Sequence, residues 1–249
     1  MLGDAITEEA VRRFWSACEQ PKEYPRELAA LVPIALPVAV ATISPLTLYS
    51  IEQWLSRRGA AFSFGCRSRA IRGCLVATSG SGIIFVDASD PANERRFTVA
   101  HEAAHFLDYL LSRETAIARF GRQIIDVLDG KRAPSLAERF SAIISHTPVQ
   151  FFTDLMERDD LDGREGDGMW EVEERADQIA LTLLAPQEDV LSSAGPLPAL
   201  FSDCFEQVKH TLQTTFGLPA SVAAGYAWGI LDGIDRGPRW AEQFKRVHR

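Results

Sequence analysis

Apolar positions in the first half of the chain come in short runs, of which the first is rich in β-branched residues. Such runs are typical of buried strands, and they lie at residues 38–43, 61–64, 74–78 and 83–86. The Ser-Gly-Ser-Gly segment at residues 79–82 separates the last two runs and suits a tight hairpin turn. We therefore expect a small sheet in this part of the chain.

The remaining apolar positions follow a helical period. Helices are expected over residues 7–20, from residue 25, and over 45–58. After a polar loop at 87–94 they are expected at 95–113, 114–128, 135–145, 148–157, 170–185, 198–215 and 219–231. The acidic, glycine-containing stretch at residues 157–169 indicates a loop. Strands followed by helices predict an α+β fold, in which a small antiparallel or mixed sheet packs on a mostly helical core with additional C-terminal helices.

The length of 249 residues suits one core with a small addition. We expect residues 1–59 to form N-terminal helices and a first strand packed on the core. Residues 60–190 form the core itself, and residues 191–249 a C-terminal helical segment.

Composition narrows the class of protein. The net charge of −8 provides no basic field, so direct nucleic-acid binding is not expected. No secretory signal is recognisable at the N-terminus, and the four cysteines form no CxxC pair, which favours free thiols in the cytoplasm. The uncharged stretch at residues 28–51 is long enough to span a bilayer, but three prolines interrupt it, so no membrane contact is expected.

The chemistry is concentrated in His-Glu-Ala-Ala-His at residues 101–105. On a helix, His101 and His105 lie on one face a turn apart and can bind one metal ion. Glu102 can reach a water molecule at that metal without becoming a ligand. These are the parts of a zinc hydrolase: one Zn²⁺ per chain that activates water, and Glu102 as general base.

A third protein ligand is required for a catalytic zinc site. A third histidine in the HExxHxxGxxH pattern is excluded, because Leu111 and Asp108 occupy the decisive positions. Among later carboxylates Glu173 is the best candidate, with Glu171 and Glu174 as alternatives. Asp177 shares the helix face of Glu173 and can accept a hydrogen bond from a ligating imidazole.

The chain resembles the ImmA/IrrE family of zinc metallopeptidase-like proteins. The likeness rests on the Arg-Phe-Thr-Val-Ala-His-Glu-Ala-Ala-His segment at 96–105, the strand at 83–87 and the helix at 173–186. Ala104 and Ala185 depart from its pattern, and the segment between the two metal helices, about 106–172, is long.

The resemblance implies a gluzincin-like site with Glu173 as third ligand and Asp177 beside it. It also implies a regulatory, stress-response type of bacterial or phage peptidase. Its protein substrate would be a partner such as a helix-turn-helix repressor.

Two other functions remain open. The chain can be a zinc-binding regulatory or sensor module that binds a partner without turnover, or a zinc amidase acting on a small molecule. Residues that could stabilise an oxyanion are His146, Tyr109 and Tyr226, and the sequence does not choose among them or indicate an oligomeric state.

Overall fold

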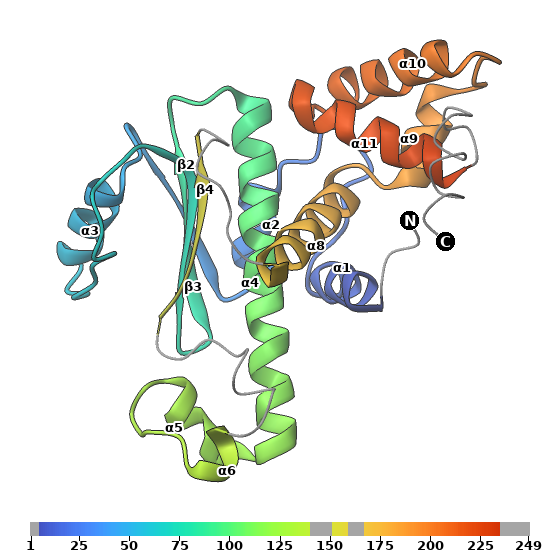
Figure 1. Cartoon of the computed structure of the whole chain (residues 1–249). Coiled ribbons are helices and arrows are strands. Elements are labelled where there is room, and N and C mark those ends of the chain that lie inside the picture. The colour runs from blue at the N-terminus through green and yellow to red at the C-terminus, as the bar shows by residue number, and fades with distance from the viewer. Residues whose placement is uncertain (1–4, 140–150, 159–166, 235–249) are drawn as a thin grey trace.

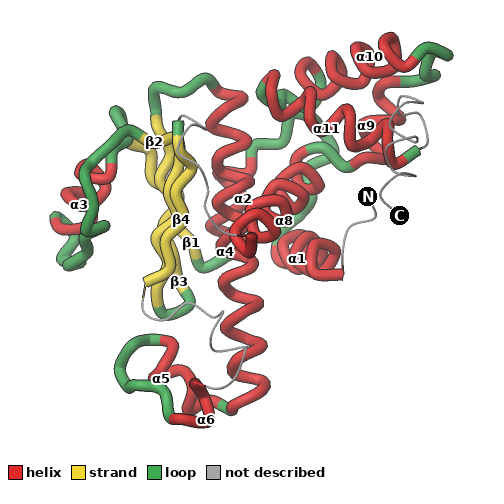
Figure 2. Tube along the Cα trace, viewed as in Figure 1, coloured by secondary structure: helices red, strands yellow, loops and turns green. Residues whose placement is uncertain are grey.

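The structure is a computed structural model that describes residues 5–139, 151–158 and 167–234. Within these ranges a four-stranded mixed sheet packs against helices on both faces (Figures 1 and 2). The α+β fold class expected from the sequence is confirmed. His146 lies outside the described residues.

The sheet contains β1 (Val38–Ile43), β2 (Ile71–Thr78), β3 (Ser81–Asp87) and β4 (Phe151–Glu157) in the order β1-β3-β2-β4. β1 is parallel to β3, and the other two pairs are antiparallel. Ser79 and Gly80 both have positive φ, 51° and 80°, in the two-residue turn between β2 and β3, the backbone that a tight hairpin needs. This confirms the predicted turn.

Each face of the sheet covers its own hydrophobic cluster. On β2, Leu75 and Ala77 face the larger cluster, whereas Cys74 and Val76 face the smaller one, as the two-residue period of a strand requires. Helix α3 (Leu48–Ser56) covers the smaller cluster, and its Trp54 packs edge-on against Phe85 of β3.

The opposite face of the sheet packs against α4 (Ala92–Phe120), the long helix beside the strands in Figure 1. It is one helix where the sequence suggested two, and it ends at Gly121, whose φ is 78°. Gly82 of β3 allows the close approach, since a β-carbon there would lie 2.9 Å from the ring of Phe106. α4 is thus fixed directly above the strands.

Further helices complete the layer around α4. α8 (Asp167–Leu184) crosses it, and α1 (Ala5–Ala17) and α2 (Leu28–Ala35) pack nearby. The short η1 (Arg122–Ile124), α5 (Ile125–Leu128) and α6 (Leu136–Arg139) follow α4. α9 (Gln187–Ala194), α10 (Phe201–Thr214) and α11 (Ala220–Gly233) form the C-terminal group.

Two further expectations from the sequence were wrong, and one helix was not expected. Residues 61–64 form no strand, although Phe62 and Phe64 pack against the smaller cluster. Residues 151–157 form β4, not the end of a helix. The helix α9 was not expected at all, because its eight residues have a single buried apolar position, Val190.

The stretch at residues 28–51 forms α2, β1 and the start of α3. No helix in the described part of the chain is long and apolar enough to cross a membrane.

The end of β4 is held by an ion-pair network around two buried carboxylates. Arg158 donates to Oδ2 of Asp87 at 2.6 Å and to Oδ1 of Asp90 at 2.8 Å. Asp87 also accepts from Ser89 and from the backbone N–H of Leu46. Burial raises the pKa of Asp87, but these hydrogen bonds outweigh burial and lower the pKa below its usual value. The carboxylate therefore stays charged and joins β4 to the end of β3.

Candidate metal centre

The central part of α4 places both histidines and Glu102 in the interior. His101, Glu102 and His105 are 4%, 0% and 1% exposed. The one-turn spacing on the helix brings the Nε2 atoms of His101 and His105 to 3.0 Å from each other. Two imidazoles with nitrogen atoms facing one point form half of a metal site.

α8 supplies the carboxylate expected from the sequence. Glu173 lies with Oε2 3.6 Å from Nε2 of His101 and with Oε1 3.6 Å from Nε2 of His105. Glu174 instead accepts a hydrogen bond from Gln178 on the exposed side of α8, and Glu171 is exposed. Of the three candidates, the structure brings Glu173 to the histidines.

Asp177 lies one turn after Glu173, with Oδ1 2.8 Å from Nδ1 of His101. This carboxylate accepts a hydrogen bond from Nδ1–H, which leaves the lone pair of Nε2 directed at the cluster. Burial lowers the pKa of His101, but Asp177 and Glu173 outweigh burial and raise it to about 10. The surroundings of His101 therefore favour positive charge at this place.

A fourth group, Asp154 of β4, was missed in the sequence. Its Oδ2 is 3.4 Å from Nε2 of His105. Donor atoms of His101, His105, Asp154 and Glu173 all lie within 4.8 Å of one another, so this buried cluster can hold a metal ion.

A signal for Asp154 existed in the strand pattern. On β4, Phe152 and Met156 face the larger core, and Asp154 lies between them on the same face. A carboxylate at a core-facing strand position requires a polar partner or a cation. Reading residues 148–157 as a helix concealed that alternation.

Glu102 stands beside the donor cluster without belonging to it. Both carboxylate oxygens are buried, with no hydrogen-bond partner of good geometry among the described residues. Burial and the charge of Asp154 raise its pKa well above the usual range, and the backbone N–H of Leu75 only partly offsets this. Burial beside the cluster thus gives the Glu102 carboxylate a high affinity for a proton.

Gly73 of β2 provides the space for Glu102. A β-carbon at this position would lie 2.4 Å from Cγ2 of Thr98 and 2.8 Å from Oε1 of Glu102. Helix α4 can therefore place the carboxylate against the strand only because residue 73 has no side chain.

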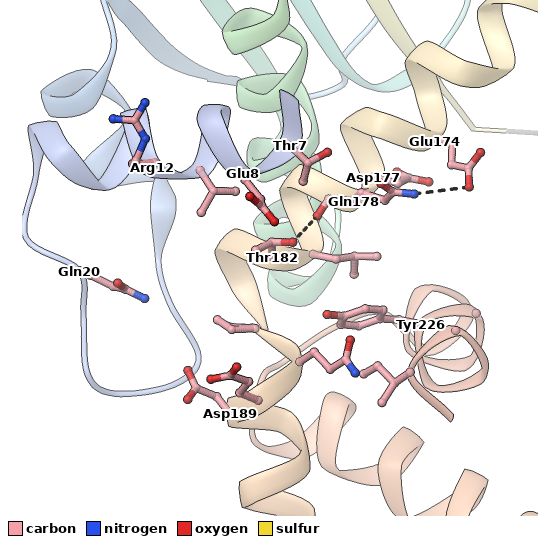
Figure 3. A pocket seen from close by; sticks show the side chains of 18 residues that line it. Thr7, Glu8, Arg12, Gln20, Glu174, Asp177, Gln178, Thr182, Asp189 and Tyr226 are labelled. Carbon is pink, nitrogen blue, oxygen red and sulfur yellow. Dashed lines mark hydrogen bonds between the residues drawn. The ribbon is translucent and has the colours of Figure 1, made fainter. Parts of the chain in front are cut away.

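A cavity of about 840 Å³ lies beyond α8, between α1 and α11 (Figure 3). Asp177 lines this cavity, and its partner His101 does not. Glu174, Gln178 and Tyr226 also line it. Tyr226 donates from its hydroxyl to the backbone carbonyl of Ala185. Tyr226 thus belongs to this cavity. The hydroxyl of Tyr109 accepts a hydrogen bond from the backbone N–H of Gly80, and its ring stacks on Phe152.

No protein-family model matches the chain, and no curated protein matches it significantly. The site itself therefore provides the basis for a function.

Proposed function

We propose that the protein is a zinc-dependent metalloendopeptidase. The observation that supports this most strongly is the buried Glu102 carboxylate next to a cluster of two imidazoles and the carboxylate of Glu173, with Asp154 as a further donor. This combination supplies three protein ligands and, separately, a base.

The donor set fits zinc. Imidazole and carboxylate donors bound to zinc at their usual distances in a tetrahedron lie about 3.3–3.5 Å from one another. Here the two Nε2 atoms of His101 and His105 are 3.0 Å apart. Each lies 3.6 Å from one of the two carboxylate oxygens of Glu173, Oε2 for His101 and Oε1 for His105. Histidines that bind a metal must be neutral, and the carboxylates of Asp154, Glu173 and Asp177 around them then leave excess negative charge that a divalent cation offsets.

Zinc, when bound, supplies a Lewis acid that polarises the peptide carbonyl and acidifies water. Glu102 then accepts the proton of the attacking water and delivers it to the leaving amine. Asp177 keeps His101 in the tautomer that has its Nε2 lone pair available. Each of these residues has one separate role that substitution can test.

An extended peptide has a place to bind along β4. This strand pairs with β2 on one side, and no described strand pairs with its other side. Unpaired backbone groups of an edge strand can pair with a peptide. The likeness to the ImmA/IrrE family suggests a protein substrate such as a helix-turn-helix repressor.

The substitution Glu102→Gln tests the mechanism. We expect the variant to bind one zinc ion like the wild type but to cleave unfolded casein or a fluorogenic peptide library at least roughly 100-fold more slowly, since general-base catalysis contributes about that much or more. Glu171→Gln, the same change at an exposed position of α8, is the control and should remain active. Wild-type activity in Glu102→Gln would disprove this role of Glu102.

Asp154 favours a second candidate function, a zinc-binding regulatory module without turnover. Four protein donors are typical of structural zinc sites, whereas catalytic sites keep one position for water. The two functions differ in whether Asp154 stays at the cluster.

A further inference from the structure

We propose that Asp154 is a fourth protein ligand of the metal and closes the site in the resting protein, so that hydrolysis requires this carboxylate to leave. The inference rests on the proposed metal binding and concerns regulation of the same site. It unites the two functions above, since one chain would have a closed state and an open state.

Distances support Asp154 as a ligand. Its Oδ2 is 3.4 Å from Nε2 of His105, within the range shown by the other three donors. Oδ2 is also fully buried, and the whole side chain is 16% exposed, about as much as Glu173 at 14%. Asp154 therefore resembles the expected third ligand in both position and burial.

The strand holds Asp154 toward α4 from both sides. Phe152 stacks on Tyr109 of α4 with 5.7 Å between ring centroids. Met156 contacts Oγ1 of Thr98, also of α4, at 3.5 Å. Within the sheet, the backbone of Asp154 lies opposite Leu75 of the neighbouring strand β2. The backbone of β4 therefore directs this carboxylate toward the cluster. Because the carboxylate is largely buried, water competes less for its oxygen atoms than it would at the surface.

Closure has a chemical consequence. A tetrahedral metal with His101, His105, Glu173 and Asp154 has no position left for water. Glu102, although correctly placed as a base, then has no water to activate. Loss of Asp154 would restore the position while leaving all other parts of the site in place.

The experiment uses the Co²⁺-substituted full chain, whose absorption spectrum reports on the ligands, with azide as the probe. We expect the wild-type spectrum to be unchanged by azide, and a crystal structure of the Zn²⁺ protein to show a carboxylate oxygen of Asp154 among the ligands. Asp154→Ala should bind one Co²⁺ at least roughly tenfold more weakly, since even loss of a supporting partner costs 10–100-fold, and azide should change its spectrum.

Thr153→Ala is the matched control, because Thr153 is the exposed neighbour of Asp154 on the opposite face of β4. It should behave like the wild type. A water ligand in the wild-type protein, or a spectral response to azide equal to that of Asp154→Ala, would overturn the inference. The wild-type measurement decides the question even if Asp154→Ala does not fold.

The outcomes also separate this inference from the proposed function. An open wild-type site with hydrolysis that depends on Glu102 would refute closure and keep the peptidase. A closed wild-type site that opens in Asp154→Ala without any hydrolysis would keep closure and refute the peptidase. A chain that binds neither Co²⁺ nor Zn²⁺ would refute both.

Discussion

The tightest packing around the candidate base occurs at a residue without a side chain. Gly73 lies on β2 directly under Glu102 and Thr98 of α4. Thr98 and Glu102 are both buried, so neither side chain can move aside into solvent. A single added methyl group would therefore have to move the helix, the strand or Glu102 itself.

We predict that Gly73→Ala lowers the free energy of unfolding by about 1–3 kcal/mol, the usual cost of overpacking. It should also slow hydrolysis more than it weakens zinc binding, because the atoms nearest to an added β-carbon belong to Thr98 and Glu102, not to the histidines. Denaturant unfolding, zinc titration and peptide cleavage measure the three effects.

Gly225→Ala is the comparison for this variant. Gly225 lies within α11, where an added β-carbon meets nothing within 4 Å. Alanine there should stabilise the helix by up to about 1 kcal/mol. Equal effects of the two substitutions would show that the close approach at Gly73 is unimportant.

Among the elements that carry the site, β4 was the hardest to predict. Helices α4 and α8 could be recognised from local periodicity, and the positions of His101, His105 and Glu173 followed from it. Along residues 151–157 the side chains alternate between the faces, but Asp154 occupies the core-facing position between Phe152 and Met156 and interrupts the apolar pattern. The local pattern fails where a polar residue is placed in the interior for a function.

We predict that Arg158→Ala destabilises β4. The substitution leaves the buried carboxylates of Asp87 and Asp90 without their shared cation, which should cost about 1–3 kcal/mol, and it should weaken metal binding through Asp154. Thermal unfolding and Co²⁺ titration are the measurements.

Arg69→Ala removes a more exposed ion pair, that with Glu157 at the same end of β4. Because solvent screens exposed pairs, its cost should be at most about 1 kcal/mol. If Arg158→Ala were no more harmful than Arg69→Ala, the ion-pair network would not anchor the strand.

At the scale of the molecule, the donor cluster joins elements that the sequence does not place together. The sheet order β1-β3-β2-β4 brings the late strand β4 beside β2 and opposite α4. Such an order depends on long-range packing, which periodicity does not report. The sequence therefore predicted the donors carried by helices, whereas Asp154 needed the tertiary structure.

Metal removal should lower the stability of the whole chain. A ligand that binds only the folded state adds about 4 kcal/mol at a free concentration 1,000 times its Kd, and for a chain of this size that corresponds to roughly 10 °C in Tm. We therefore expect a chelator to lower Tm and added zinc to restore it.

His105→Ala provides the control for metal removal. This variant lacks one of the two imidazoles and should show little response of Tm to chelator or zinc. A wild-type Tm that does not change with zinc would contradict the metal centre itself.

The division of the donors among α4, β4 and α8 has a consequence for synthesis of the protein. A ribosome releases the histidine helix long before α8, so a growing chain contains two imidazoles without the carboxylates that complete the cluster. Metal sites rarely exist before folding, and domains fold as their segments become available. Capture of the metal would then require a chain synthesised beyond α8, and fragments that end before α8 would lack the complete donor cluster.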